Sequence, residues 1–176
     1  MMKRAGCRVI QFGVESGNQA VLDANHKGDT LEQCRNAAWW CRETGIRSDM
    51  SFIFGLPYDD RRTIRDTARF SRELDPDFLA YFTFIPYPGT PAGDLARRGE
   101  ANLRLLHSDY SRYEQQFSLP CELQDVPANR LGFLRFTSYL RFFSKPRKWR
   151  SLISMINPAS LPRVVMNMVA DWLFRR

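Results

Sequence analysis

The stretch "IQFGVESGN", residues 10–18, decides the fold of the first part of this chain. It completes a near-continuous apolar run over residues 8–14, and such a run is typical of a strand that is buried on both faces. Glu15 and Ser16 follow the run directly. We therefore predict a strand that ends in two adjacent polar side chains.

Two later apolar runs predict further strands. They are "MSFIFG", residues 50–55, and "PDFLAYFTFIP", residues 76–86. Helical sequence separates the three runs, over residues 31–44 and 58–75. Strands that alternate with helices predict an α/β fold, in which helical crossovers connect the strands of a parallel sheet.

The ends of the two predicted helices carry recognisable signals. Thr30 is a candidate N-cap, and Gln33 stands three residues later, as in a capping box. Gly45 is expected to end this helix in a left-handed conformation. Asp59 and Asp60 are expected in the first turn of the second helix, where negative charge is favourable.

Polar or turn-rich segments follow all three predicted strands. These are Glu15 with Ser16, then residues 55–59, then residues 86–90. The carboxyl ends of parallel strands share one edge of a sheet, and ligands bind there. The combination favours a ligand site. Each segment also has a structural interpretation, because Glu15 could accept backbone N–H bonds, Asp59 could be a helix-start charge, and "PYPGTP" could be a rigid turn followed by a short helix over "LARRGE".

The four cysteines do not form CxxC or CxxxCxxC. Cys34 and Cys41 are seven residues apart and should share one face of a helix. Two cysteines are a weak metal signal, because zinc and iron–sulfur sites usually have four ligands. Core packing is the favoured interpretation, and we predict no metal ligands in this chain.

Charge is distributed unevenly. Residues 1–129 hold 16 Lys/Arg and 18 Asp/Glu, a net charge of −2, whereas residues 130–176 hold 10 Lys/Arg and one Asp, a net charge of +9. Residues 127–143 look helical, with Leu131, Leu134 and Leu140 as inward candidates. A helical extension with a solvated basic face, an anionic membrane surface and nucleic acid are the three interpretations of this segment, and nucleic acid is the least favoured.

Three pieces of the sequence together resemble a known family. They are "FGVESGNQAVLDANHKG", "SFIFGLPYDD" and "DTARFSRELDPDFLAYFTFIPYPGTP", within residues 8–92. Their order and spacing resemble the second half of the core of radical S-adenosylmethionine (SAM) enzymes, in the group that often carries an N-terminal cobalamin-binding domain. The resemblance implies strands four to six of a six-stranded partial (β/α) barrel. We thus expect about three β/α units over residues 1–100, a linker or irregular segment over 101–126, and a basic amphipathic helical extension over 127–176.

The resemblance also implies which residues contact SAM. Glu15 and Ser16 would make polar contacts, Ile53 and Gly55 would lie beside the adenosyl group, and the segment around Ile85 would border the adenine. The full set of expected cofactor-binding residues is Glu15, Ser16, Ile53, Gly55, Asp59, Ile85, Pro86 and Tyr87. Three positions depart from the family pattern: Ser51 replaces a common Gly, Asp59 replaces a common Glu, and His26 precedes "KG". The family pattern assigns no catalytic side chain here.

The cluster motif CxxxCxxC of that family does not occur in this sequence. The resemblance implies SAM and a 4Fe–4S cluster in the intact protein, with cobalamin as a further cofactor of the group. We therefore expect this chain to be inactive alone and to need the N-terminal half of the barrel, from a longer polypeptide or a separate subunit. The expected substrate is a small or lipid-like molecule. The alternative functions are a non-catalytic binding module and a basic adaptor that contacts membranes.

The sequence shows neither an apolar run of the roughly 18 residues that a membrane span needs nor an apolar segment typical of a secretory signal. We therefore expect a cytoplasmic protein, with peripheral membrane contact through residues 127–176.

Overall fold

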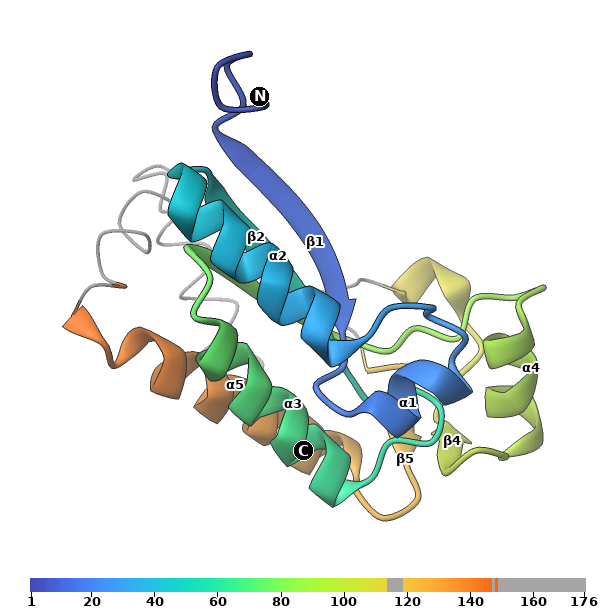
Figure 1. Cartoon of the computed structure of the whole chain (residues 1–176). Coiled ribbons are helices and arrows are strands. Elements are labelled where there is room, and N and C mark those ends of the chain that lie inside the picture. The colour runs from blue at the N-terminus through green and yellow to red at the C-terminus, as the bar shows by residue number, and fades with distance from the viewer. Residues whose placement is uncertain (114–118, 147, 149–176) are drawn as a thin grey trace. The chain divides into compact units, whose positions relative to one another are not determined.

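The computed structural model describes residues 1–113, 119–146 and 148. The chain divides into two compact units, residues 1–141 and 142–176, and the first holds nearly all of the described structure. In chain order the elements are β1 (Val9–Glu15), α1 (Gln19–Ala24), α2 (Leu31–Thr44), β2 (Arg47–Phe54), α3 (Arg61–Leu74), β3 (Phe78–Thr83), α4 (Pro91–Arg98), β4 (Leu103–Leu105), η1 (Tyr110–Arg112), β5 (Cys121–Leu123) and α5 (Ala128–Phe143) (Figure 1).

The first three strands form one parallel sheet in the order β1-β2-β3. Helices α1 and α2 connect β1 to β2, and α3 connects β2 to β3 (Figure 1). The predicted α/β class with a parallel sheet is therefore confirmed. Within the described residues, β1 and β3 each pair with β2 alone, so both are edge strands of this sheet.

The helix ends follow local sequence signals closely. Thr30 and Gln33 form the predicted capping box, and Gly45 ends α2 with a φ of 66°. The prediction for the start of α3 was wrong, because its first turn holds no acidic residue and Asp60 is the N-cap. The Asp60 carboxylate accepts hydrogen bonds from two backbone N–H groups, so Asp59 is left one residue outside the helix.

The loop predicted after the third strand is shorter than expected. Helix α4 begins at Pro91, four residues before the segment "LARRGE" over which the sequence analysis expected a short helix. Thr90 caps the helix by accepting a hydrogen bond from the Gly93 N–H, and Pro91 supplies a fixed φ at the first helical position. This Thr-Pro pair is a helix-start signal, which explains why the loop prediction was wrong.

Residues 101–126, expected to be a linker or irregular, contain regular structure. Strands β4 and β5 pair in an antiparallel two-stranded sheet, with Leu103 opposite Leu123. Both leucines are buried. The described residues of this segment therefore include a small sheet, while the domain boundaries at 100 and 127 stay a prediction.

Side chains alternate between the two faces of the parallel sheet. One face is mostly covered, and its buried residues include Met50, Phe52, Phe54, Leu79 and Tyr81. The Tyr81 ring packs against Phe52 and Phe54 of β2, and its hydroxyl lies 2.5 Å from Ser71 Oγ on α3. This covered face, with Ile64 and Leu74 of α3, is the hydrophobic core that holds the sheet in place.

The opposite face of the sheet is only half-buried. Ser51 of β2 pairs with Gly13 of β1 and Ala80 of β3, and Ile53 pairs with Phe82. Residues 51, 53, 80 and 82 are all partly accessible, unlike their neighbours on the covered face. This open face leads up to the carboxyl ends of the three strands.

Helix α5 completes the covered face. A Cβ on Gly55 would lie 3.1 Å from the Leu131 side chain, so α5 approaches the end of β2 closely. The Tyr139 hydroxyl accepts a hydrogen bond of 2.7 Å from the Tyr81 N–H. Leu131 is buried as predicted and Leu134 is half-buried, but Leu140 is exposed, so the inward assignment of Leu140 was wrong. The helices expected after residue 148 lie outside the described residues. Among the helices that the structure describes, none combines the length and the apolar character that crossing a membrane requires.

Candidate functional site

A cavity of about 470 Å³ lies at the carboxyl ends of the three parallel strands. It is lined by the end of each strand, by the segments that follow the strands, and by α1 and α4. The lining residues are Glu15, Leu22, Asn25, Lys27, Ser51, Ile53, Leu56, Phe82, Thr83, Phe84, Ile85, Tyr87 and Ala92. Four of the eight predicted cofactor-binding residues, Glu15, Ile53, Ile85 and Tyr87, are among them.

The backbone brings the Glu15 side chain into this cavity through an irregularity in β1. The register with β2 shifts between Gly13 and Glu15, and Glu15 has a φ of 65°. A Cβ at position 13 would lie 2.4 Å from Glu15 Oε1, so a glycine at this position leaves space for the carboxylate. A bulge that redirects a side chain at a strand end is common near functional sites.

Lys27 is the cation that faces Glu15. Its Nζ lies 3.6 Å from Glu15 Oε1 and 3.9 Å from Asp29 Oδ2. Burial raises the pKa of the Glu15 carboxyl, and the charge of Lys27 opposes that rise. The site therefore holds a half-buried ion pair, with a carboxylate that can accept hydrogen bonds from a ligand.

The sequence analysis missed Lys27 and Asn25 as site residues. Lys27 stands in the turn after α1, where its N–H donates to Leu22 O at 3.0 Å. The Asn25 side chain donates to Pro57 O at 2.9 Å, which ties this turn to the segment after β2. A basic residue before Gly28 was the available signal, because the turn after α1 belongs to the connection between the first and second strands.

The rest of the cavity wall is mostly apolar. Leu22 of α1, Ile53 of β2, Phe82 of β3 and Ile85 present hydrocarbon or aromatic surface, and Ser51 and Thr83 add hydroxyl groups to the lining. An apolar pocket with a few polar groups is typical of sites for small organic ligands. The arrangement can therefore hold a flat or apolar moiety while Glu15 fixes its orientation.

Ser16 does not line the cavity, although it follows Glu15 directly. It is completely buried, and its Oγ lies 3.2 Å from Thr67 Oγ1 on α3. The Gly17 N–H donates to the same Thr67 oxygen at 2.9 Å. Ser16 therefore attaches the turn after β1 to α3 in this structure, and its predicted contact with SAM stays a prediction.

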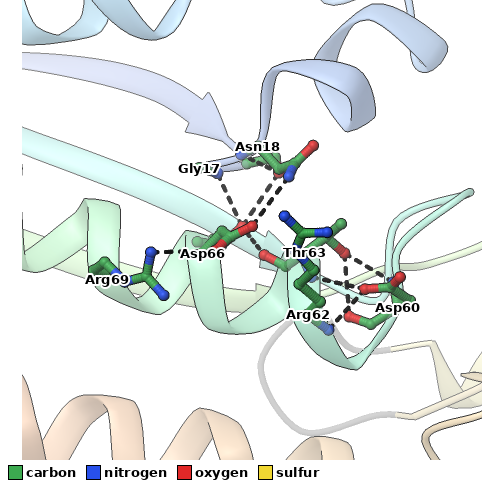
Figure 2. Close-up of polar contacts among 9 residues, drawn as sticks. Gly17, Asn18, Asp60, Arg62, Thr63, Asp66 and Arg69 are labelled. Carbon is green, nitrogen blue, oxygen red and sulfur yellow. Dashed lines mark hydrogen bonds and ion pairs between the residues drawn. The ribbon is translucent and has the colours of Figure 1, made fainter.

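The turn and α3 approach each other closely at Gly17. A Cβ there would lie 2.6 Å from Phe70 Cβ and 2.7 Å from Thr67 Cα. Next to it, Asn18 Nδ2 donates to Asp66 Oδ2 at 3.1 Å, and Asp66 also pairs with Arg69 (Figure 2). Only a residue without a side chain fits between the turn and the helix.

Asp59 has a similar anchoring position after β2. It is 1% exposed, and its Oδ2 accepts hydrogen bonds of 3.1 Å from both the Gly55 and the Leu56 N–H groups. The Thr63 hydroxyl donates to its other oxygen at 2.6 Å. Burial raises the pKa of Asp59 to about 6, although these hydrogen bonds lower it. Asp59 thus shapes the loop beside the cavity without lining it.

Gly55 and Pro86 also lie outside the cavity lining. Gly55 has a φ of 83°, which suits glycine, and its Cα faces Leu131 of α5. Pro86 is buried between Ile85 and Tyr87, which both line the cavity. These two residues therefore position lining residues in this structure, and direct contact with SAM stays a prediction for them.

The cysteines fit the core-packing interpretation. All four are free thiols, with Cys41 and Cys121 buried and the other two half-buried. Burial raises the pKa of Cys34 and Cys41, and that of Cys121 to about 11, which keeps the thiols neutral. Over residues 1–113, 119–146 and 148, no group of three or more His, Cys, Asp or Glu side chains is arranged to hold a metal ion.

Comparison with known proteins relates this chain to part of larger enzymes. No family model matches it. An uncharacterized methyltransferase of Pyrococcus horikoshii is 29% identical over 146 residues, which cover 83% of this chain and 31% of that protein. The anaerobic magnesium-protoporphyrin IX monomethyl ester cyclase of Cereibacter sphaeroides is 30% identical over 89 residues, covering 51% of this chain and 14% of the cyclase. The chain thus spans less than a third of the length of either relative.

A solved structure shares the fold. The radical SAM methyltransferase TsrM from Kitasatospora setae, determined with cobalamin and a 4Fe–4S cluster, matches 61% of this chain and 23% of its own chain, with a TM-score of 0.50 and 24% identity. The homologues of this chain are radical SAM enzymes, and the chain is similar to part of each of them.

Proposed function

We propose that residues 1–100 form the second half of the partial (β/α) barrel of a radical SAM enzyme. They supply the wall that binds SAM and part of the substrate cavity. The intact protein then cleaves SAM reductively or transfers a methyl group by a radical route. One observation carries this proposal: Glu15, Ile53, Ile85 and Tyr87, expected to border SAM, come from three successive strand ends and line a single cavity.

The lining residues fit SAM chemically. An adenosyl group combines a flat aromatic ring with ribose hydroxyls, so it needs an apolar wall and a hydrogen-bond acceptor. Ile53 and Ile85 offer the apolar wall, and the Glu15 carboxylate offers the acceptor. Lys27 keeps that carboxylate oriented, at a distance of 3.6 Å. In this arrangement the chain binds and orients SAM, while the hard chemistry belongs to the cofactor.

The residues of this chain do not fit a 4Fe–4S cluster. The sequence lacks CxxxCxxC, and the described residues hold no candidate metal centre. When bound elsewhere in the assembly, a cluster supplies the electron for SAM cleavage. We propose that its ligands, and any cobalamin site, lie in a further part of the same polypeptide or in a separate subunit. This agrees with the small share of each relative that the chain covers.

The half-buried face of the parallel sheet is the surface against which the substrate would bind. Ser51, Ala80 and Phe82 are half-buried on that face, and they would face the interior of a complete barrel. Asp49 lies deeper on the same face, and burial raises the pKa of its carboxyl. We propose that a small or lipid-like substrate enters against this mainly apolar surface.

The first test is to read the gene upstream of the Met1 codon and produce the chain with the cluster-bearing half found there or in a neighbouring gene. SAM binding is then measured by equilibrium dialysis, and 5′-deoxyadenosine formation by chromatography. Glu15→Ala should weaken SAM binding at least about tenfold, as expected for loss of a charged hydrogen-bond partner. Ile53→Trp should fill the cavity and also weaken binding.

The matched control is Glu32→Gln, which changes an exposed carboxylate on α2 and should leave binding unchanged. SAM affinity that neither cavity variant alters would contradict the proposed site. A folded, monomeric chain that binds no SAM with or without its complement would instead favour a non-catalytic binding module.

A further inference from the structure

Helix α5 has two apolar faces rather than one. Its inner face carries Leu131 and Ser138, which are buried. Its opposite face carries Phe133, Phe136 and Leu140, which are 59%, 44% and 55% exposed. Spacings of three and four residues place these three side chains in one row along the helix. We call this row the outer stripe.

A solvent-facing row of this composition needs an explanation. Single exposed apolar residues are ordinary, but the outward side of a surface helix is normally polar. Here three large apolar side chains follow each other over two helical turns, on a helix whose inner face carries the buried Leu131 and Ser138. The outer stripe therefore lies mostly outside the packed core of residues 1–141.

The charge around the outer stripe is positive. At 100° per residue, Arg130 and Arg141 fall within about 100° of the stripe, one near each end of the helix. Both arginines are exposed. The sequence from residue 130 onward holds ten Lys/Arg and one Asp. A partner of this surface should accordingly combine negative charge with an apolar interior.

We propose that the outer stripe binds an anionic lipid membrane, with α5 lying in the plane of the membrane surface. Phe133, Phe136 and Leu140 enter the boundary between headgroups and acyl chains, while the basic residues contact the anionic headgroups. Basic residues beside a row of large apolar side chains are the pattern of interfacial helices. This proposal rests on α5 and on the charge of the C-terminal segment, and it stands whether or not SAM binds in the cavity.

Charge favours an anionic membrane over a second copy of the chain and over the segment 149–176 as the partner of the outer stripe. A second copy of the chain would bring Arg130 and Arg141 against the same arginines, and like charges repel. The segment 149–176 holds four arginines and one Asp, so it is also positive and offers no complementary charge. The phosphates of a nucleic acid would pair with the arginines, but they would not provide an apolar environment for the Leu140 side chain.

The experiment measures vesicle binding of the full 1–176 chain, produced with its complementary half where that is needed for folding. Vesicles of phosphatidylcholine with 30% phosphatidylglycerol, which is about the anionic content that attracts basic segments, are compared with pure phosphatidylcholine in flotation assays. The chain should bind the anionic vesicles, and the bound fraction should fall as salt rises. The triple variant Phe133→Ser, Phe136→Ser, Leu140→Ser should lower the partition coefficient at least about tenfold, because three apolar insertions are lost.

Two controls separate the outer stripe from general effects. Trp40→Ser changes an exposed aromatic residue on α2 and should leave vesicle binding unchanged. Phe133→Leu with Phe136→Leu keeps the stripe apolar and should keep most of the binding. Circular dichroism of each variant shows whether the helix content of the chain is kept, so that a folding defect is recognised.

Four outcomes would overturn the proposal. The first is a folded triple variant that binds vesicles as tightly as the native chain, and the second is equal loss of binding in Trp40→Ser. The third is a native dimer that becomes monomeric in the triple variant, which would assign the stripe to a second copy. The fourth is absence of vesicle binding together with salt-sensitive binding of a mixed-sequence RNA.

Discussion

Two regions at the strand ends use neighbouring residues for different purposes. The cavity region contains Glu15, Ile53 and Ile85, which are partly accessible or face the cavity. The anchor region contains Ser16, Gly17 and Asp59, which are buried and bind other parts of the chain. Glu15 and Ser16 are adjacent in sequence, yet one faces the cavity and the other faces α3.

This difference teaches that a short motif at a strand end can hold both a ligand-facing residue and its support. The anchor region fixes the backbone against α3, and the backbone then fixes the direction of the Glu15 side chain. Substitutions in the anchor region should therefore reduce the free energy of unfolding, whereas substitutions in the cavity region should change ligand affinity alone. The predictions below test that separation.

The largest expected effect is that of Gly17→Ala. The new Cβ would overlap Phe70 Cβ, Thr67 Cα and Asp66 O, two of which are backbone atoms that cannot rotate away. We expect a loss of about 3 kcal/mol or more in the free energy of unfolding, at the upper end of overpacking effects. Urea denaturation followed by circular dichroism measures it.

The matched control for Gly17 is Gly132→Ala in α5. Among the residues that the structure describes, a Cβ at position 132 meets only Leu119, at an ordinary 3.8 Å. This substitution should be neutral or stabilise the helix by roughly 0.5–1 kcal/mol, because alanine is the better helix former. Equal stability losses in the two variants would show that the contact at Gly17 is not the cause.

Asp59→Ala should have the next largest effect. The substitution removes a buried carboxylate that accepts hydrogen bonds from the Gly55 and Leu56 N–H groups and from the Thr63 hydroxyl. We expect the free energy of unfolding to fall by roughly 2–4 kcal/mol. Each donor left without an acceptor costs about 1–3 kcal/mol, and removing a buried carboxylate offsets part of that cost. Asp60→Ala, which removes only an exposed N-cap, should cost about 1 kcal/mol in the same denaturation assay.

Asp59 should also make the free energy of unfolding depend on pH, in the direction opposite to that of most carboxylates. Its pKa in the folded chain is about 6, above the ordinary carboxyl value of 3.8. The folded state therefore keeps this proton to higher pH than the unfolded state, and the contribution of Asp59 to stability falls as pH rises from about 4 to about 6. The decrease in the free energy of unfolding is on the order of 2–3 kcal/mol, because each pKa unit of difference corresponds to about 1.4 kcal/mol. Asp59→Asn should abolish this decrease, since an amide does not titrate.

The measurement is the difference in free energy of unfolding between the native chain and Asp59→Asn across this pH range. Other carboxylates titrate in both proteins and cancel in the difference. A difference that stays constant with pH would mean that Asp59 keeps an ordinary pKa in the folded chain.

The smallest effect on stability is expected for Glu15→Gln. The ion pair with Lys27 is half-exposed, and such pairs contribute about 0–1 kcal/mol. The substitution should therefore change the free energy of unfolding by less than about 0.5 kcal/mol, while SAM affinity falls because the carboxylate charge is lost. Large destabilisation by Glu15→Gln would place Glu15 in the anchor region and remove the distinction between the two regions.

Much of the fold could be predicted from local sequence. The three apolar runs correspond to β1, β2 and β3, and the Thr30–Gln33 capping box and Gly45 mark the ends of α2. These features depend on interactions within a few residues, so their sequence signals are strong. The α4 boundary failed because the Thr90-Pro91 signal was not used, and the regular structure in residues 101–126 was missed because its strands are only three residues long.

The candidate site could be predicted only in part. Local sequence was enough to predict that polar or turn-rich segments follow three parallel strands and meet at one edge, because parallel strands place their carboxyl ends on the same side of a sheet. Which side chains face the cavity depends on tertiary contacts. The bulge between Gly13 and Glu15 turns one carboxylate toward Lys27, and the close contact of Gly17 with α3 turns Ser16 into the core. Both depend on contacts between segments far apart in sequence, and a local pattern carries no information about such contacts.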